Sequence, residues 1–178
     1  MKRLIILLAG LALPFLLIAQ ANDPVENLFN KYSGKDGFTT VYISSKMLGL
    51  FSQENTGDKD VDNLLSNLKS IRILTVEDSL LNNKVNFYSE LQKGTGLSGY
   101  EELMLVKESN GITVFLTREK DNRIAELLII SSGKDNNSLI SIRGSMNLND
   151  ISKLSEKVGI EQLDKLDKLE NSKKKDNQ

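Results

Sequence analysis

The chain has 178 residues, with 23 basic and 24 acidic side chains, no Cys and no His. This nearly balanced charge gives no reason to expect nucleic acid as a partner. The missing thiols and imidazoles exclude cysteine nucleophiles, thiolate zinc sites and the usual Ser–His catalytic pair. An enzyme built from this chain would depend on carboxylates, Lys or Tyr. We therefore expect no catalytic residue, no cofactor and no metal ligand.

The first 21 residues have the pattern of a secretory signal peptide. Lys2 and Arg3 precede an apolar run, and Ala19-Gln20-Ala21 supplies the small residues of a cleavage site. The alternative is a membrane anchor, but an apolar run of about 15 residues is short for a bilayer, which needs roughly 20. We expect cleavage after Ala21, export to the periplasm or the exterior, and no membrane span in the mature chain.

The mature chain is expected to form one domain over residues 22–159. Its first helix begins after Asp23, which can cap the helix, with Pro24 at the first helical position. The apolar stripe of this helix consists of Val25, Leu28, Phe29 and Tyr32.

Further helices and strands alternate up to residue 94. Residues 38–44 are rich in aromatic and β-branched side chains and predict a strand, as do residues 71–76. Between them we expect a helix from Ser44 or Ser45 and another from Asp58 or Asp60, the second with the stripe Val61, Leu64, Leu65 and Leu68. One more helix is expected from Asp78 or Ser79, with Leu81, Val85, Tyr88 and Leu91 on one face.

Four strands over residues 102–108, 112–118, 124–132 and 138–143 predict an antiparallel meander. Asn110-Gly111 predicts a type I′ turn, with positive φ at both central residues. A last helix is expected from Asn147 or Asn149, with Leu148, Ile151, Leu154 and Val158 on its apolar face. Residues 160–178 form a charged tail that we expect to be partly disordered.

This order predicts an α+β fold: a mostly antiparallel sheet of about six strands, with helices packed on one face. Alternation along residues 112–117 places Ile112, Val114 and Leu116 on one face of their strand. We expect the stripes around Leu64 and Leu154 to cover that face. Phe115 points the other way, so it marks either a partner surface or a second cover such as the helix after Asp23.

Three motifs with known chemistry fit structural roles better. Gly94-Thr95-Gly96-Leu97-Ser98-Gly99 spells G-x-G-x-x-G but follows a helix and precedes a strand, the reverse of a dinucleotide site. Asp58-Lys59-Asp60-Val61-Asp62 opens like a calcium loop, but Asn63 and Lys69 occupy positions that need Gly and Glu. Ser66-Asn67-Leu68-Lys69 spells S-x-x-K without the accompanying Lys-Thr-Gly.

Several of these segments resemble one family of small exported proteins of Gram-negative bacteria. The segments are Phe38–Ser44 with Lys46-Met47-Leu48, Ser70–Glu77, Tyr100–Met104, Leu139–Ile142 and Leu148–Leu154. The family is a domain-of-unknown-function family, number 4252. The resemblance implies export and a single domain, and it supplies no active site. Some similar proteins look like lipoproteins, but this chain lacks the Cys that a lipid anchor requires.

The sequence does not define a biochemical function. We expect a non-enzymatic binding or accessory domain of the bacterial envelope, which contacts another envelope protein or a peptide through a sheet face or edge. The alternatives are a carboxylate-based hydrolytic enzyme and a subunit of an envelope stress-sensing system. A pocket that joins several carboxylates would favour the enzyme, whereas an exposed apolar patch would favour the binding domain.

Overall fold

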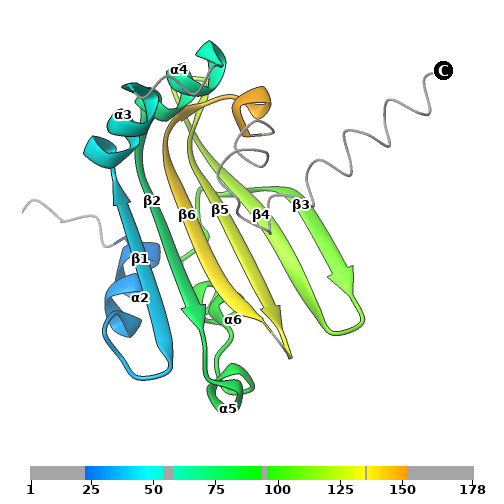
Figure 1. The fold of residues 1–178 in the computed structure, drawn as a ribbon. Helices are drawn as coiled ribbons and strands as arrows, with labels where there is room; N and C mark the ends of the chain where they lie inside the picture. Colours follow the sequence, from blue (N-terminus) through cyan, green and yellow to red (C-terminus); the bar gives the residue numbers. More distant parts are fainter. Residues whose placement is uncertain (1–22, 54–57, 94–95, 135, 152–178) are drawn as a thin grey trace, which may run out of the picture.

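The computed structural model describes residues 23–53, 58–93, 96–134 and 136–151, and its central feature is one six-stranded sheet. The strands are Phe38–Ser44 (β1), Leu68–Val76 (β2), Glu101–Glu108 (β3), Gly111–Lys120 (β4), Arg123–Gly133 (β5) and Asn137–Met146 (β6). Their order in the sheet is β1-β2-β6-β5-β4-β3, and every neighbouring pair is antiparallel (Figure 1). The predicted α+β class and the meander of β3 to β6 are confirmed.

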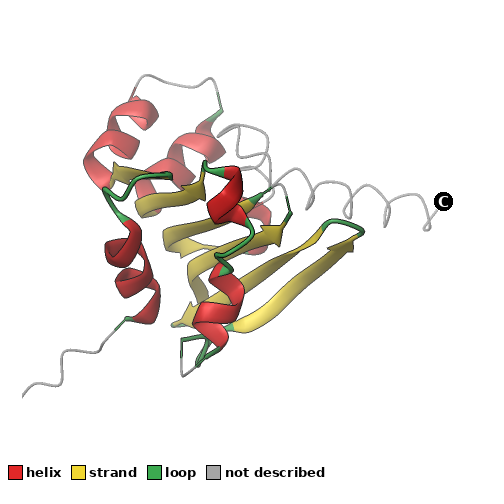
Figure 2. Ribbon diagram, turned by 90° about the horizontal axis from the view of Figure 1, so that it is seen from below, coloured by secondary structure: helices red, strands yellow, loops and turns green. Residues whose placement is uncertain are grey.

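The helices lie on both sides of this sheet (Figure 2). They are Pro24–Tyr32 (α2), Ser45–Gln53 (α3), Lys59–Asn67 (α4), Ser79–Asn82 (α5) and Phe87–Gln92 (α6), and residues 148–151 are also helical. The predicted signal peptide, the charged tail, and Leu154 and Val158 lie outside the described residues, so those predictions stay predictions.

Two separate apolar cores follow from this arrangement, and the prediction of helices on one face is wrong. One core joins α3, α4 and Ile151 to one face of the sheet, and the other joins α2 and α6 to the opposite face. The reason is visible in β5, where Leu127 and Ile129 enter the first core while Leu128 and Ile130 enter the second. A continuous apolar run in a strand is typical of a strand that is buried on both faces.

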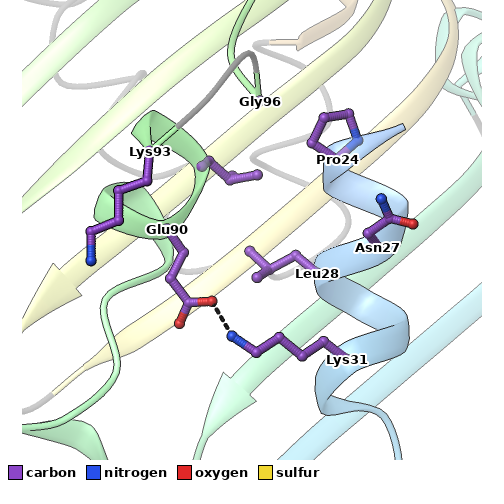
Figure 3. A pocket seen from close by; sticks show the side chains of 8 residues that line it. Pro24, Asn27, Leu28, Lys31, Glu90, Lys93 and Gly96 are labelled. Atoms are coloured by element: carbon purple, nitrogen blue, oxygen red, sulfur yellow. Dashed lines mark hydrogen bonds and ion pairs between the residues drawn. The ribbon is translucent and has the colours of Figure 1, made fainter. Parts of the chain in front are cut away.

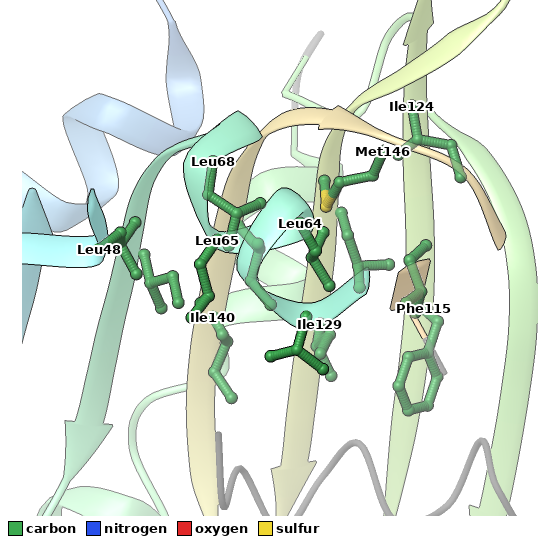
Figure 4. Packing of buried hydrophobic residues seen from close by; sticks show 14 residues of the cluster. Leu48, Leu64, Leu65, Leu68, Phe115, Ile124, Ile129, Ile140 and Met146 are labelled. Atoms are coloured by element: carbon green, nitrogen blue, oxygen red, sulfur yellow. The ribbon is translucent and has the colours of Figure 1, made fainter. Parts of the chain in front are cut away.

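The assignment of helices to faces is therefore reversed for β4. Val114 and Leu116 pack in the core of α2 and α6, whereas the predicted cover, Leu64 and Leu65 of α4, lies on the opposite face (Figure 4). Phe115 belongs to that opposite core and has no exposed surface. Of the two alternatives for Phe115, the partner surface is therefore not formed and a second cover is present, but this cover is α4 and not the helix after Asp23.

The hairpin turns also differ from the prediction. Asn110 and Gly111 do not have positive φ, whereas Asp121 and Asn122, between β4 and β5, have φ of 54° and 57°. The type I′ conformation thus fits the later turn. Gly111 serves close packing instead, because a Cβ there would lie 2.7 Å from the carbonyl oxygen of Ser132 and 2.8 Å from Cα of Gly133.

Side-chain caps fix the starts of the helices. Asp23, Asp58 and Asp78 each accept backbone N–H groups of the first turn of α2, α4 and α5, respectively. The single helix expected after Asp78 is broken into α5 and α6, because Asn86 caps a new start. Asn82 ends the first piece with a buried side chain that donates to backbone carbonyls of residues 133 and 134.

Candidate binding surfaces

The free edge at β1 is the clearest candidate for a binding surface. β1 pairs with β2 on one side, and in the described residues no strand pairs with its other side. Thr39, Thr40, Val41 and Tyr42 are all exposed. The strand carries no charged residue, no Pro and no Gly, and its register with β2 runs without a bulge. Natural proteins usually protect an edge strand with charged residues, Pro or a bulge. Because β1 has none of these, it remains competent to pair with another strand.

The opposite edge of the same sheet, β3, makes an instructive comparison. It carries Glu101, Glu102, Lys107 and Glu108, and its register with β4 shifts between Glu102 and Met104. Charges and bulges are the usual means by which an edge strand avoids pairing with other chains. Because β3 is protected and β1 is not, β1 is the edge at which another polypeptide strand can pair with the sheet.

Exposed apolar side chains gather in and next to β1. Five of the nine large apolar residues that are exposed in the described chain fall within residues 41–51, with exposed fractions between 39 and 59 %. They are Val41, Tyr42, Met47, Leu50 and Phe51, which we call the β1–α3 surface. Leu48 of the same helix is buried against the sheet, so α3 keeps one side in the core and presents the rest of its apolar residues to solvent.

A small pocket of about 140 Å³ borders this edge, lined by Phe29, Asn30, Ser33, Thr40, Val41, Tyr42 and Arg72. The Arg72 guanidinium lies 5.0 Å from the ring centre of Tyr42 and forms an ion pair of 2.5 Å with Glu26 of α2. This arrangement holds the Tyr42 ring against the sheet while the side chain remains largely exposed. The pocket could receive one side chain of a strand added to β1.

A buried carboxylate organises a second polar cluster, beside the N-terminus of α2. Glu126 of β5 has no exposed surface and accepts from Tyr100, Arg118, Ser141 and Arg143. The Ser141 hydroxyl lies 2.6 Å and the Arg143 Nε 3.0 Å from the same carboxylate oxygen. Such a fully bonded carboxylate is suited to holding strands together, and no oxygen of it faces solvent.

Asp23 links this cluster to α2. One of its carboxylate oxygens accepts from the backbone N–H groups of Val25 and Glu26, and the other lies 2.6 Å from the Arg143 guanidinium. Burial disfavours the charged form of Arg143, but the charges and hydrogen bonds of Glu126 and Asp23 together outweigh burial and raise the pKa of Arg143. The guanidinium therefore stays charged and links α2 to β6.

Two further pockets lie at other places on the described surface. The first, of about 230 Å³, lies between α2 and α6, and Lys31 and Glu90 form an ion pair of 2.6 Å at its rim (Figure 3). The hydrogen bond that Lys31 donates to the Glu90 carboxylate raises the pKa of Lys31. The second, of about 330 Å³, is lined by asparagines that include Asn82, Asn86 and Asn137. The Oδ1 atom of Asn137 accepts no hydrogen bond but is shut off from solvent, so it does not face this pocket.

Two of the three motifs take the expected structural roles where the structure describes them, but Ser66-Asn67-Leu68-Lys69 does not lie on one helix, because α4 ends at Asn67 and β2 begins at Leu68. Asp58 caps α4 through bonds to the N–H groups of Asp60 and Val61. Gly96 and Gly99 lie in the connection between α6 and β3, while Gly94 and Thr95 lie outside the described residues. Among the residues that the structure describes, no three acidic side chains form a metal site and no helix is long and apolar enough to cross a membrane.

Sequence reasoning missed both the free edge and the charged cluster. The edge could have been inferred from the lack of charge in residues 38–44, but its place in the sheet depends on the strand order. The cluster has a weaker signal: Arg118, Glu126 and Arg143 interrupt apolar strands. Their meeting depends on the registers of β4, β5 and β6, which pair Arg118 with Glu126 and Glu126 with Arg143.

The comparisons with known proteins identify the family but no activity. Neither the curated proteins nor the solved structures include a significant match to this chain. A family model described as a domain of unknown function, DUF4252, matches residues 32–154, which is well over half of the chain and runs from the end of α2 past the end of β6. The chain therefore belongs to the DUF4252 family, as its resemblance in sequence implied.

Proposed function

We propose that this protein is an exported, non-enzymatic binding domain of the Gram-negative envelope, and that β1 takes up an extended segment of polypeptide by strand addition. The observation that carries this proposal is the contrast between the two sheet edges. β1 is uncharged, regular and exposed, whereas β3 is charged and bulged. The apolar β1–α3 surface next to the edge supports the same reading, since exposed apolar patches mark interaction sites.

The backbone of β1 supports strand addition at specific residues. The N–H of Glu77 donates to the carbonyl of Gly37 at 2.9 Å, which makes Gly37 and Glu77 a hydrogen-bonded pair. Antiparallel pairs alternate between bonded and non-bonded, and the register of β1 has no shift. Thr39 and Val41 thus bond to β2, whereas the N–H and C=O groups of Thr40 and Tyr42 point to the free edge.

Export is supported by the charged start, apolar run and Ala19-Gln20-Ala21 of the first 21 residues. The hydrolytic alternative gains no support from Glu126, because its oxygens are buried and already bonded. No particular observation favours the stress-sensing alternative.

A photocrosslinking experiment in cells tests the proposal. Benzoylphenylalanine replaces Tyr42 at the β1 edge or, as the control position, Leu103 at the β3 edge. We expect a covalent adduct from position 42 and none from position 103, with the cross-linked residue mapped to one defined segment of the partner. The partner in this test can be a second copy or another protein.

A pair of variants at one position makes the test specific for strand addition. Thr40→Pro removes the outward N–H without removing a bond to β2, whereas Thr40→Val retains the N–H. We expect Thr40→Pro to abolish the adduct from position 42 and Thr40→Val to retain it. Two results contradict the proposed function. One is that position 42 forms no adduct in the chain that keeps Thr40, and the other is that the adduct persists in Thr40→Pro.

A further inference from the structure

We infer that the segment taken up by β1 carries an acidic side chain between two apolar ones, and that Arg72 of β2 binds the acidic side chain. The inference rests on the proposed strand addition and names the chemistry of the partner. Two features of the β1 edge carry it: the two faces of the strand have different surroundings, and Arg72 has N–H donors that no described residue uses.

The two faces of β1 differ in what lies beside them. Thr40 and Tyr42 point to the side of α2, because they line one pocket together with Asn30 of that helix. Val41 points to the opposite side, since it pairs with Ile73 of β2, which packs in the core of α3 and α4. Side chains of a strand alternate between its faces. A strand added to β1 therefore places every second side chain beside α2 and the others beside the apolar β1–α3 surface.

The pocket on the α2 side is the one of about 140 Å³ that borders β1, and Arg72 is the one charged residue of its described lining. We call it the Arg72 pocket. The guanidinium lies 5.0 Å from the ring centre of Tyr42 and 5.8 Å from that of Phe29. The two rings hold the guanidinium in position while 25 % of the Arg72 side chain remains exposed. The pocket therefore offers a fixed, accessible cation beside the free edge.

Arg72 is also the least satisfied arginine of the neighbouring charged cluster. Within the described chain it forms one ion pair, of 2.5 Å with Glu26, and its other side-chain N–H groups bond to no described residue. The Glu26 carboxylate is itself shared, because its second oxygen lies 3.6 Å from Arg143. Arg118 and Arg143 each meet two or more carboxylates. Arg72 is thus the arginine that can bind a further carboxylate.

A carboxylate fits these donors better than any other side-chain group. A guanidinium carries several N–H donors in a planar fork and no acceptor, and its bonds to carboxylates are stronger than its bonds to neutral groups. A basic side chain would bring a like charge to Arg72, and an apolar side chain would cover N–H groups without bonding them. Asn30, Ser33 and Thr40 also line the pocket and can donate to a carboxylate oxygen that Arg72 leaves free.

We assign the acidic residue to the position opposite Thr40 in an antiparallel pairing. Thr40 directs its N–H and C=O groups to the free edge, so the residue opposite forms a hydrogen-bonded pair with it and shares its face. The short side chain of Thr40 leaves more room beside it than the ring of Tyr42. The residues on either side of the acid point to the face of Val41, where apolar side chains cover it. The partner is therefore an extended apolar–acidic–apolar segment.

Synthetic peptides test the acidic preference. The probe is the fluorescein-labelled heptapeptide Val-Thr-Val-Glu-Val-Thr-Val-amide, with N-methyl groups on its valines so that only one of its edges can pair with a strand. Its binding to the full exported chain is measured by fluorescence polarisation. We expect replacement of Glu by Gln to raise the dissociation constant about tenfold, and replacement by Lys to raise it further. Thr40→Pro should abolish the binding of the Glu peptide.

Two variants of the protein locate the preference at Arg72. Arg72→Gln should weaken binding of the Glu peptide about tenfold and leave binding of the Gln peptide unchanged. Glu26→Gln removes the carboxylate that competes for Arg72 and should strengthen binding of the Glu peptide. Both variants break the same ion pair, so a shared loss of stability does not explain opposite effects on binding. Arg123→Gln, which breaks the ion pair with Asp150, is the matched control and should change nothing.

The outcomes separate this inference from the proposed function. Equal binding of the Glu and Gln peptides, abolished in Thr40→Pro, overturns the acidic preference and leaves strand addition standing. An adduct from position 42 without binding of any peptide also overturns the inference, as does equal weakening of the Glu and Gln peptides by Arg72→Gln. The absence of both peptide binding and the adduct contradicts the proposed function itself.

Discussion

Glu126 shows how one residue can hold several elements together. It lies on β5, and its carboxylate binds Arg118 of β4, Arg143 and Ser141 of β6, and Tyr100, the residue before β3. Two cationic side chains thus share one buried anion, and Arg143 also pairs with Asp23. Removing one member of a buried ionic group leaves its partners uncompensated, which is far costlier than never having formed the group.

Glu126→Gln should therefore lower the free energy of unfolding by roughly 1.5–3 kcal/mol, because Arg118 and Arg143 would lose charge-assisted hydrogen bonds to a buried carboxylate while Asp23 still pairs with Arg143. The measurement is urea denaturation at neutral pH. Glu119→Gln, at an exposed position of β4, is the matched control and should stay within about 0.5 kcal/mol of the wild type. Equal effects of the two substitutions would show that Glu126 has no special role in the cluster.

The Tyr100 hydroxyl gives the same cluster an alkaline limit. Burial, and after it the negative charge of Glu126, raises the pKa of Tyr100. In an unfolded chain a tyrosine ionises at about pH 10. Because the folded chain holds this proton more tightly, the contribution of Tyr100 to stability is complete below about pH 10 and is lost as the pH rises above it.

A comparison with Tyr100→Phe should reveal this loss. We expect the difference in unfolding free energy between the wild type and Tyr100→Phe to be constant near neutral pH and to shrink above about pH 10. Denaturant titrations at a series of pH values give the difference directly, and the other tyrosines cancel in it. A difference that stays constant into the alkaline range would contradict the assigned role.

At the scale of the element, two glycines have opposite structural roles. Gly49 lies in α3, and a Cβ at that position meets nothing within 4 Å. Gly111 begins β4, where a Cβ would collide with the backbone of residues 132 and 133 of β5. Gly49 is therefore a weak point of a helix, whereas Gly111 is required by close approach of two strands.

Gly49→Ala should raise the free energy of unfolding by about 0.5–1 kcal/mol, because Ala is the better helix former. Gly111→Ala should lower it by roughly 1–3 kcal/mol, because the backbone of β5 has to move. Thermal unfolding followed by circular dichroism compares the two variants. Destabilisation by Gly49→Ala, or tolerance of Gly111→Ala, would reverse this distinction.

The elements themselves were largely predictable because their signals are local. The cap at Asp23, the stripe of α4 and the alternation in residues 112–117 each fix a helix or strand without knowledge of the rest of the fold. The break between α5 and α6 was missed although Asn86 is a local cap, because the place where α5 ends depends also on the distant bonds from Asn82 to residues 133 and 134. The type I′ turn was predicted at the wrong hairpin for the same reason. Gly111 is required by its close contact with β5 and not by the conformation of its own turn.

At the scale of the whole molecule, the main error concerned layers. The four apolar residues of 127–130 indicate burial on both faces, and the helices accordingly divide into two groups. Val114 and Phe115 are neighbours in β4 that enter different cores, and each is fully buried. No local pattern tells which helix covers which face, because that depends on the path of the chain between them.

Truncation of each neighbour tests the two-core arrangement. Val114→Ala should cost roughly 1–3 kcal/mol and Phe115→Ala roughly 3–5 kcal/mol, because each leaves a cavity in its own core. Urea denaturation midpoints measure both effects. A low cost for Phe115→Ala would mean that this face of β4 is not a core. It would also conflict with the buried hydrogen bond between Thr113 and Ser131 beside it.

The stability of the whole chain should be independent of redox state and of transition metals. The sequence contains no Cys and no His, so we expect the thermal midpoint to be unchanged by a reductant or by a chelator of transition metals. Differential scanning calorimetry measures the midpoint in each condition. A rise on addition of calcium would contradict the assignment of Asp58 as a helix cap and would restore its loop as a binding site.

The position of β6 has a consequence for the order in which the protein can fold. This last strand lies between β2 and β5, and its Arg143 holds Asp23 from a distance of 120 residues along the chain. The sheet cannot close until residue 146 is available, and contacts so distant in sequence form slowly. In a chain that crosses a membrane with its N-terminus first, the early segments could not complete the sheet before β6 had crossed. A sheet that closes late is therefore compatible with export of an unfolded chain.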